Sequence, residues 1–282
     1  MTSKARQEAA PCGDRRVSVI GAGEMGRTLI GGWIETGVVD PASIFATAAH
    51  EPRIARVSES FGVEGAVDNR RAAEFGDTVL LAVKPQTADH VLSEIGDVLG
   101  PNQVLVSILA SVSTAYIERR LPEGIPVVRA MPNTPSRVAA GMTALCAGRF
   151  ASSEHVELAE QLFRPLGRTV VADEKHMDAI TGLSASGPAF LYIVIEALAE
   201  GGVKAGLPRK MAIELAAQSC LGAGKMVIDT ERHPALLKDE VTTPAGCTVD
   251  GILRLEEGGL RVTLIKAIIE AAARAAELVP DE

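Results

Sequence analysis

The first 175 residues alternate short apolar runs with stretches of helical period. Runs rich in apolar and β-branched residues occur at 17–20, 44–47, 78–83, 103–109, 127–131, 142–146 and 169–172. Between them, apolar residues recur at helical spacing over 24–36, 52–61, 86–99, 113–121 and 153–166. The run 78–83 is apolar almost throughout, as in a strand that is covered on both faces. This alternation predicts an α/β fold with a doubly wound, mostly parallel sheet.

From residue 175 onward the pattern is helical only. Long helices are predicted over 188–205, 208–229 and 260–278, with a shorter helix over 249–257. The first of them opens with a continuous apolar run, so both of its sides should be buried. Helices of this kind would expose much apolar surface in a single chain, and a homodimer interface is the simplest way to cover it. The alternative is that these faces pack on the sheet domain.

The change of pattern divides the chain into three regions. They are a tail at 1–16, an α/β domain at 17–174 and an all-helical domain at 175–282. A length of 282 residues agrees with two folded domains, because a typical domain has about 150 residues.

Composition excludes several classes of function. A net charge of −8 and an aromatic content of 3% argue against nucleic acid as the main partner. The four cysteines and five histidines are scattered without the spacing of a metal site, so no metal is expected. No apolar run approaches the roughly 20 residues that span a bilayer, and residues 1–16 contain no apolar stretch. We therefore expect no membrane partner, no secretory signal and a cytoplasmic location.

A glycine-rich motif follows the first predicted strand and opens the first predicted helix. It reads G-x-G-x-x-G, and in this context it predicts a dinucleotide site. Gly21 permits the tight turn, Gly23 lets a pyrophosphate approach the backbone, and Gly26 lets helix and strand pack closely. Glu24 and Met25 lie in the first turn, where free N–H groups face the phosphates. The alternative is an ordinary glycine turn.

The end of the second strand indicates which dinucleotide is bound. An acidic residue there would hold the ribose 2′-hydroxyl of NADH. The strand instead ends in Thr47 and Ala48, the first acid is Glu51, and Arg53 lies close by. This pattern favours the 2′-phosphate of NADPH. NADH stays open as an alternative, because Glu51 could turn inward and Arg53 could be an ordinary surface residue.

Two more strand ends are expected to face the cofactor, since ligands gather at the carboxyl ends of strands in open α/β sheets. One strand end carries a lysine. The other carries an asparagine in a loop with two prolines, and this asparagine could present its amide to a nicotinamide. The alternatives are a solvated lysine and a structural turn. The residues concerned are Ala82, Val83, Lys84, Pro85 and Asn133.

A second constellation of polar groups precedes the predicted helix 249–257. Threonine hydroxyls flank a Pro-x-Gly turn, and the N–H groups that follow should be unpaired at a helix start. Such a site suits a small carboxylate. The alternative is a threonine-capped helix without a ligand. The residues expected to contact substrate are Thr243, Ala245, Gly246, Cys247 and Thr248.

Five motifs in this order resemble the pyrroline-5-carboxylate reductase family, from residue 17 to the final helix. They read GAGEMG, AVKP, MPNTP, TGLSASGPA and PALLKDEVTTPAGCT. The resemblance implies NAD(P)H-dependent reduction of L-1-pyrroline-5-carboxylate to L-proline, the last step of proline biosynthesis. It also implies a Rossmann domain at 17–174, a helical dimerisation and substrate domain at 175–282, and dimers that can assemble into a decamer.

The resemblance assigns roles to individual residues. Thr243 and Thr248 match substrate-contacting hydroxyls, Glu231 matches an acid near the ring nitrogen, and Asn69 matches an asparagine beside the adenosine. Thr248 is the residue we expect to bond the ring nitrogen; Glu231 could instead solvate a helix end. Many members carry serine at Thr243 and glycine at Ala245, and neither departure removes a hydrogen-bond donor.

The sequence leaves two rival functions open. One is a two-domain reductase of the 3-hydroxyacid dehydrogenase kind, which places a catalytic lysine on the first long helix after the sheet domain. That helix carries Glu196 and Glu200 here, and no lysine before Lys204. The other is a nucleotide-sensing protein without turnover, against which the presence of the whole threonine segment speaks.

Overall fold

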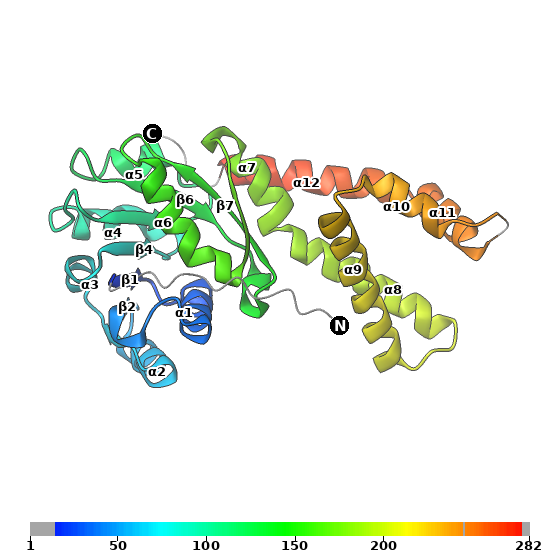
Figure 1. The fold of residues 1–282 in the computed structure, drawn as a ribbon, viewed down its shortest axis with the longest axis horizontal. Helices are drawn as coiled ribbons and strands as arrows, with labels where there is room; N and C mark the ends of the chain where they lie inside the picture. The colour runs from blue at the N-terminus through cyan, green and yellow to red at the C-terminus, as the bar shows by residue number, and fades with distance from the viewer. Residues whose placement is uncertain (1–14, 245, 278–282) are drawn as a thin grey trace. The chain divides into compact units, whose positions relative to one another are not determined.

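The computed structural model describes residues 15–244 and 246–277, and it divides into two compact units. One unit runs to Ala185 and includes the end of the last helix from Ala271. The other unit is Ser186–Glu270. Both are drawn in Figure 1.

The first unit is built on one eight-stranded sheet in the order β3-β2-β1-β4-β5-β6-β7-β8. All neighbouring strands are parallel except β6 and β7. The strands are β1 (Val17–Ile20), β2 (Ile44–Thr47), β3 (Glu64–Ala66), β4 (Thr78–Leu81), β5 (Val104–Ser107), β6 (Val127–Met131), β7 (Gly141–Ala147) and β8 (Gly167–Val171). The predicted mostly parallel α/β sheet is confirmed. Strand β3 was missed, because its three residues form no apolar run.

Helices cover both faces of this sheet (Figure 1). The central strands are buried at every position and mostly apolar, because successive side chains point to opposite faces and both faces are covered. In β4, Leu80 belongs to one buried cluster, while Val79 and Leu81 belong to the other. The helices of this unit are α1 (Glu24–Thr36), α2 (Glu51–Phe61), α3 (Asn69–Phe75), α4 (Ala88–Ile95), α5 (Thr114–Glu118), α6 (Ser153–Phe163) and α7 (Met177–Ile180). A π-helical turn, Thr181–Ala185, follows α7.

The second unit consists of helices in its described residues. They are α8 (Gly187–Lys204), α9 (Arg209–Thr230), α10 (Pro234–Val241), α11 (Cys247–Glu257) and α12 (Leu260–Glu277), the last of which continues past Glu270. Helices α8 and α9 pack together through a small buried cluster of alanines, Ala199, Ala212 and Ala216 (Figure 1). The predicted helices 188–205, 208–229, 249–257 and 260–278 match these elements to within two residues over the part described.

Large apolar side chains of the helical unit stay exposed in the single chain. Ile193 is 65% exposed and Ile269 is 59% exposed. The expectation that both sides of the first long helix are buried is therefore not met within one chain. By length and composition alone, the segments Glu174–Lys204 and Arg209–Thr230 could also cross a membrane. Neither segment was predicted from the sequence to do so, because both are apolar only on average and contain no unbroken apolar run of membrane-spanning length.

The single tryptophan of the chain joins α1 to the end of α6. Trp33 is fully buried, and its indole N–H donates a hydrogen bond of 2.7 Å to the carbonyl of Leu162. We expect Trp33→Phe to lower the free energy of unfolding by about 1–3 kcal/mol, because it leaves that buried carbonyl unpaired. Urea denaturation followed by far-ultraviolet circular dichroism measures the change. Val138→Ala, at a side chain that is 76% exposed, is the control; an equal midpoint for Trp33→Phe and wild type would contradict the prediction.

Candidate active site

The glycine motif forms a tight turn between β1 and α1. Gly21 has a φ of +100°, and a Cβ there would lie 2.8 Å from the backbone of Ala82. A Cβ on Gly26 would lie 2.6 Å from the carbonyl oxygen of Gly21. Both positions therefore require glycine for packing. A Cβ on Gly23 would meet no protein atom within 4 Å, so this residue leaves open space at the N-terminus of α1, where a phosphate group would fit.

Thr47, the last residue of β2, holds this turn in place. Its backbone carbonyl accepts a hydrogen bond from the N–H of Ala22 at 2.6 Å, and its hydroxyl accepts one from Gly21 at 3.3 Å. The same hydroxyl donates to Oδ1 of Asn69 at 2.7 Å. Thr47 is buried, and its hydroxyl is engaged by the protein. The structure thus brings the predicted residues Thr47 and Asn69 together with the glycine turn.

The start of α2 lies directly after β2. Ala48 is buried, whereas Glu51 and Arg53 are both exposed in the first turn of α2. Within residues 15–244 and 246–277, Arg53 makes no ion pair, so its guanidinium is available to a negatively charged group. A cation at this strand end suits a phosphate on the ribose.

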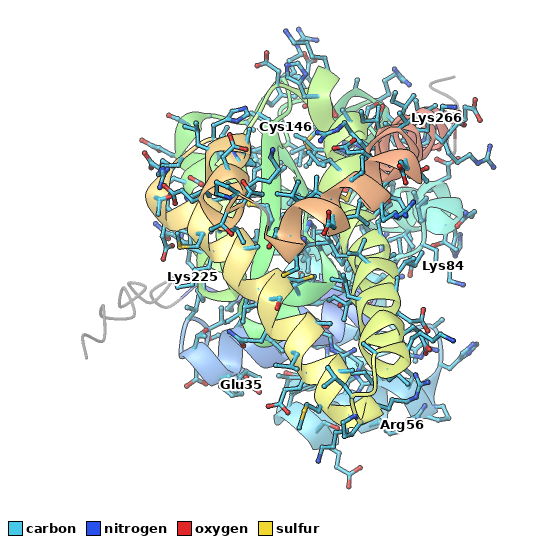
Figure 2. The ribbon with its side chains drawn as sticks, turned by 90° about the vertical axis from the view of Figure 1, so that its right-hand side faces the viewer. Glu35, Arg56, Lys84, Cys146, Lys225 and Lys266 are labelled. Atoms are coloured by element: carbon cyan, nitrogen blue, oxygen red, sulfur yellow. The ribbon has the colours of Figure 1, made fainter. Side chains whose placement is uncertain are left out.

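The segment after β4 also reaches the carboxyl edge of the sheet. Ala82 and Val83 are half-buried, Pro85 opens a short 3₁₀ turn, and Lys84 is exposed. Figure 2 labels Lys84, with its side chain drawn outside the ribbon. Its ammonium group is therefore free to meet a solvent-borne ligand.

Asn133, expected to present its amide to a nicotinamide, is buried and forms hydrogen bonds to two other segments of the chain. Its Nδ2 donates to the carbonyl of Ser184 at 3.1 Å, and its Oδ1 accepts from the N–H of Met142 at 2.9 Å. The side chain is 8% exposed. The amide oxygen and one N–H thus tie the end of β6 to β7 and to the π-helical turn. The geometry gives Asn133 a structural part, and its contact with a cofactor stays a prediction.

A charge cluster that the sequence did not predict is centred on the buried Arg129. Arg129 of β6 is 3% exposed and lies 3.4 Å from both Glu174 and Asp178. Glu174 also accepts hydrogen bonds from the N–H and the hydroxyl of Thr114. Burial raises the pKa of the neighbouring Cys146 to about 12, so this thiol stays protonated at neutral pH. An arginine inside an otherwise apolar strand was the one signal that could have revealed the cluster.

The threonine segment joins α10 to α11. The hydroxyl of Thr242 donates to the carbonyl of Asp239 at 2.8 Å, and the N–H of Gly246 donates to the carbonyl of Thr243 at 3.0 Å. The expectation that the Gly246 N–H is unpaired is therefore wrong, because the carbonyl of Thr243 accepts its hydrogen bond. Ala245 lies outside the described residues.

Two of the three expected N–H groups remain at the start of α11. Cys247 and Thr248 occupy its first turn, where backbone N–H groups have no partner within the helix. Thr243 and Cys247 are exposed, and Thr248 is half-buried. The helix start can therefore still bind a small anion.

Glu231 ends α9 with an unusual backbone conformation. Its φ is +54°, its N–H donates to the carbonyl of Val227 at 3.1 Å, and its side chain is exposed. Glycine is the usual residue at such a left-handed helix end. A non-glycine residue held there carries backbone strain, which is found more often at functional positions than elsewhere.

Two family models match the chain. A model described as pyrroline-5-carboxylate reductase dimerisation matches residues 174–278. A model described as NADP oxidoreductase, coenzyme F420-dependent, matches residues 16–111.

Similar proteins match the chain over nearly its whole length. It is 42% identical to a pyrroline-5-carboxylate reductase of Methanosarcina acetivorans, over 94% of this chain and 98% of the relative. It is 40% identical to that of Arabidopsis thaliana, over 95% and 97%.

Among solved structures, a pyrroline-5-carboxylate reductase from Coxiella burnetii superposes with a TM-score of 0.87 at 37% identity, over 95% of this chain and 99% of the other. A pyrroline carboxylate reductase from Plasmodium falciparum with NADP bound gives a TM-score of 0.85 at 27% identity, over 93% and 97%.

Proposed function

The chain belongs to the pyrroline-5-carboxylate reductase family, and we propose that it reduces L-1-pyrroline-5-carboxylate to L-proline as the final step of proline biosynthesis. It is an NAD(P)-dependent oxidoreductase. NADPH is the proposed hydride donor, and NADH is the alternative. The observation that carries the proposal is the identity of about 40% over almost the full length of both proteins.

The proposed cofactor site lies around the glycine turn and the neighbouring strand ends. The open space at Gly23 and the start of α1 fit a pyrophosphate, and the exposed Arg53 fits a 2′-phosphate. Asn69 is proposed to contact the adenosine, and Lys84 to lie near the phosphates or nicotinamide. The full set is Gly21, Gly23, Glu24, Met25, Gly26, Thr47, Ala48, Arg53, Asn69, Ala82, Val83, Lys84, Pro85 and Asn133.

The proposed substrate site is the start of α11 with the threonine segment. The carboxylate of the substrate binds the N–H groups of Cys247 and Thr248 and the hydroxyl of Thr243. The hydroxyl of Thr248 bonds the ring nitrogen, and Glu231 stabilises the positive charge of the protonated imine. When bound, the cofactor supplies a hydride to the imine carbon. The residues of the chain orient the ring and keep the nitrogen protonated, so that positioning provides most of the rate.

The proposed division of labour follows the two regions of the sequence. We propose a dinucleotide-binding domain at 17–174 and a dimerisation and substrate domain at 175–282, with 1–16 as a tail. The dimerisation model that matches 174–278 supports this division. The apolar faces of α8, α9 and α12 would then be covered by a second copy, and such dimers could assemble into a decamer. A cytoplasmic location suits a biosynthetic enzyme of this kind.

The test is an assay of the purified chain with racemic pyrroline-5-carboxylate and each reduced nicotinamide cofactor. We expect substrate-dependent loss of the nicotinamide absorbance, faster with NADPH, together with the appearance of proline. A parallel assay with a 3-hydroxyacid and oxidised cofactor tests the rival dehydrogenase, which reduction of NADP⁺ or NAD⁺ would favour. The position of Lys204 as the last residue of α8 speaks against that result. Cofactor binding without turnover would favour a sensor.

A further inference from the structure

We propose that Glu94 is a positioning residue for dinucleotide binding that acts through the amide of Asn69. The proposal rests on the proposed function in one respect, namely that Asn69 contacts the cofactor. Glu94 lies in α4, Asn69 is the first residue of α3, and nothing in the sequence motifs connects them. The contact between them is a product of the fold.

A chain of hydrogen bonds runs from Glu94 to the glycine turn. Nδ2 of Asn69 donates to Oε2 of Glu94 at 2.8 Å, and Oδ1 of Asn69 accepts from the hydroxyl of Thr47 at 2.7 Å. The hydroxyl of Thr47 in turn accepts from the N–H of Gly21 at 3.3 Å. Three of these four groups, those of Gly21, Thr47 and Asn69, lie at or within three residues of the carboxyl ends of β1, β2 and β3, where ligands of open α/β sheets bind.

The carboxylate decides which way the amide points. An ionised carboxylate only accepts hydrogen bonds, so the NH₂ group of Asn69 must face Glu94 and the amide oxygen must face Thr47. In that orientation one N–H of Asn69 is used by Glu94, and the second is left to donate to a ligand. The bond to Glu94 is charge-assisted and is stronger than a neutral one.

Loss of Glu94 removes this constraint. The side-chain amide of Asn69 can then rotate by about 180°, so that its oxygen points away from Thr47. The hydroxyl of Thr47 then faces the NH₂ group of Asn69, which donates a hydrogen bond, instead of the oxygen, which accepts one. A hydroxyl that must accept from Asn69 is less well placed for Gly21. The cost should fall on ground-state binding of the dinucleotide, since the groups involved belong to the cofactor side of the site and not to the substrate side.

The experiment compares Glu94→Ala, Asn69→Ala and the double variant by steady-state kinetics and by titration of NADPH fluorescence. We expect Glu94→Ala to raise both KM and Kd for NADPH about tenfold, which corresponds to the loss of one hydrogen bond to a charged group. The value of kcat should stay within about twofold of wild type, because this hydrogen bond stabilises the ground state and the transition state equally. In the Asn69→Ala background, Glu94→Ala should have no further effect, because it acts through that amide. Glu94→Gln, whose carbonyl can still accept but whose NH₂ group can also donate, fixes the amide less strictly and should retain only part of the affinity.

Asp97→Ala is the matched control from the residues just after α4. Asp97 forms an exposed ion pair with Arg70, and its loss should leave the KM for NADPH unchanged. The proposal is overturned if Glu94→Ala binds NADPH normally, if its effect adds in full to that of Asn69→Ala, or if only thermal stability changes. Failure of the proposed function would give a different result: the wild-type chain would bind NADPH but would not oxidise it in the presence of pyrroline-5-carboxylate. The NADPH titration would still test the role of Glu94 in that case.

Discussion

Replacing Thr248 with alanine is expected to lower kcat about a hundredfold, the usual order of effect when one hydrogen-bonding group is removed from the reacting atoms. The KM for NADPH should stay within about twofold, because a residue that acts only in the transition state leaves cofactor binding unchanged. Thr248 is half-buried in the first turn of α11, and the backbone N–H groups that would bind the substrate carboxylate remain in the variant. The loss should therefore fall on turnover.

Two further variants distinguish the hydroxyl from the fold. Thr248→Ser keeps the hydroxyl and should recover most of the activity. Thr263→Ala removes a hydroxyl that donates to the carbonyl of Gly259 at 3.0 Å near the start of α12, and it should leave kcat unchanged. Full activity in Thr248→Ala would show that this hydroxyl does not bond the ring nitrogen.

Gly23→Ala is expected to abolish most cofactor affinity without loss of stability. Its Cβ would meet no protein atom within 4 Å, and its φ is −76°, so the folded protein accommodates alanine. The methyl group would project into the space where we place the pyrophosphate. We expect the KM for NADPH to rise by about tenfold or more, because the phosphates could no longer reach the N–H groups of α1.

Gly26→Ala gives a different result and serves as the comparison. Its Cβ would lie 2.6 Å from the carbonyl oxygen of Gly21, so the turn itself must shift, and both melting temperature and cofactor affinity should fall. A normal KM for NADPH in Gly23→Ala would contradict the placement of the pyrophosphate, whatever its melting temperature.

Elements with a strong local signal were predictable from the sequence. The apolar strands β1, β2 and β4 were located because buried parallel strands need apolar residues on both faces. Strand β3 was missed because Glu64 and Gly65 give no such run; it is held by its pairing with β2. The π-helical turn 181–185 was missed as well, since nothing in its composition distinguishes it from an ordinary turn.

In the candidate site, too, some residues were predictable from the sequence and others were not. Gly21 and Gly26 were predictable because their backbone conformation and close packing admit no side chain. The environment of Asn133 was not, because its partners Met142 and Ser184 are brought to it by the fold. Arg129 and Glu94 were missed for the same reason: their contacts join segments that are distant along the chain.

In the helical unit, the single chain does not bury all of its large apolar side chains. The apolar run 189–195 was expected to be buried, yet Leu191 and Ile193 are more than half exposed. Burial of such residues depends on a second protein surface, and a pattern within one chain cannot identify it. The match of residues 174–278 to a dimerisation family favours a second copy of the chain, and not a membrane, as the surface that covers them.

Transfer of deuterium from the cofactor to the product tests the account most directly. The purified chain would be supplied with NADPH that carries deuterium at both positions of nicotinamide C4, together with unlabelled pyrroline-5-carboxylate, and the product would be analysed by mass spectrometry. The account predicts proline with a single deuterium, located at C5, the former imine carbon. No proline, or proline without deuterium, would contradict it.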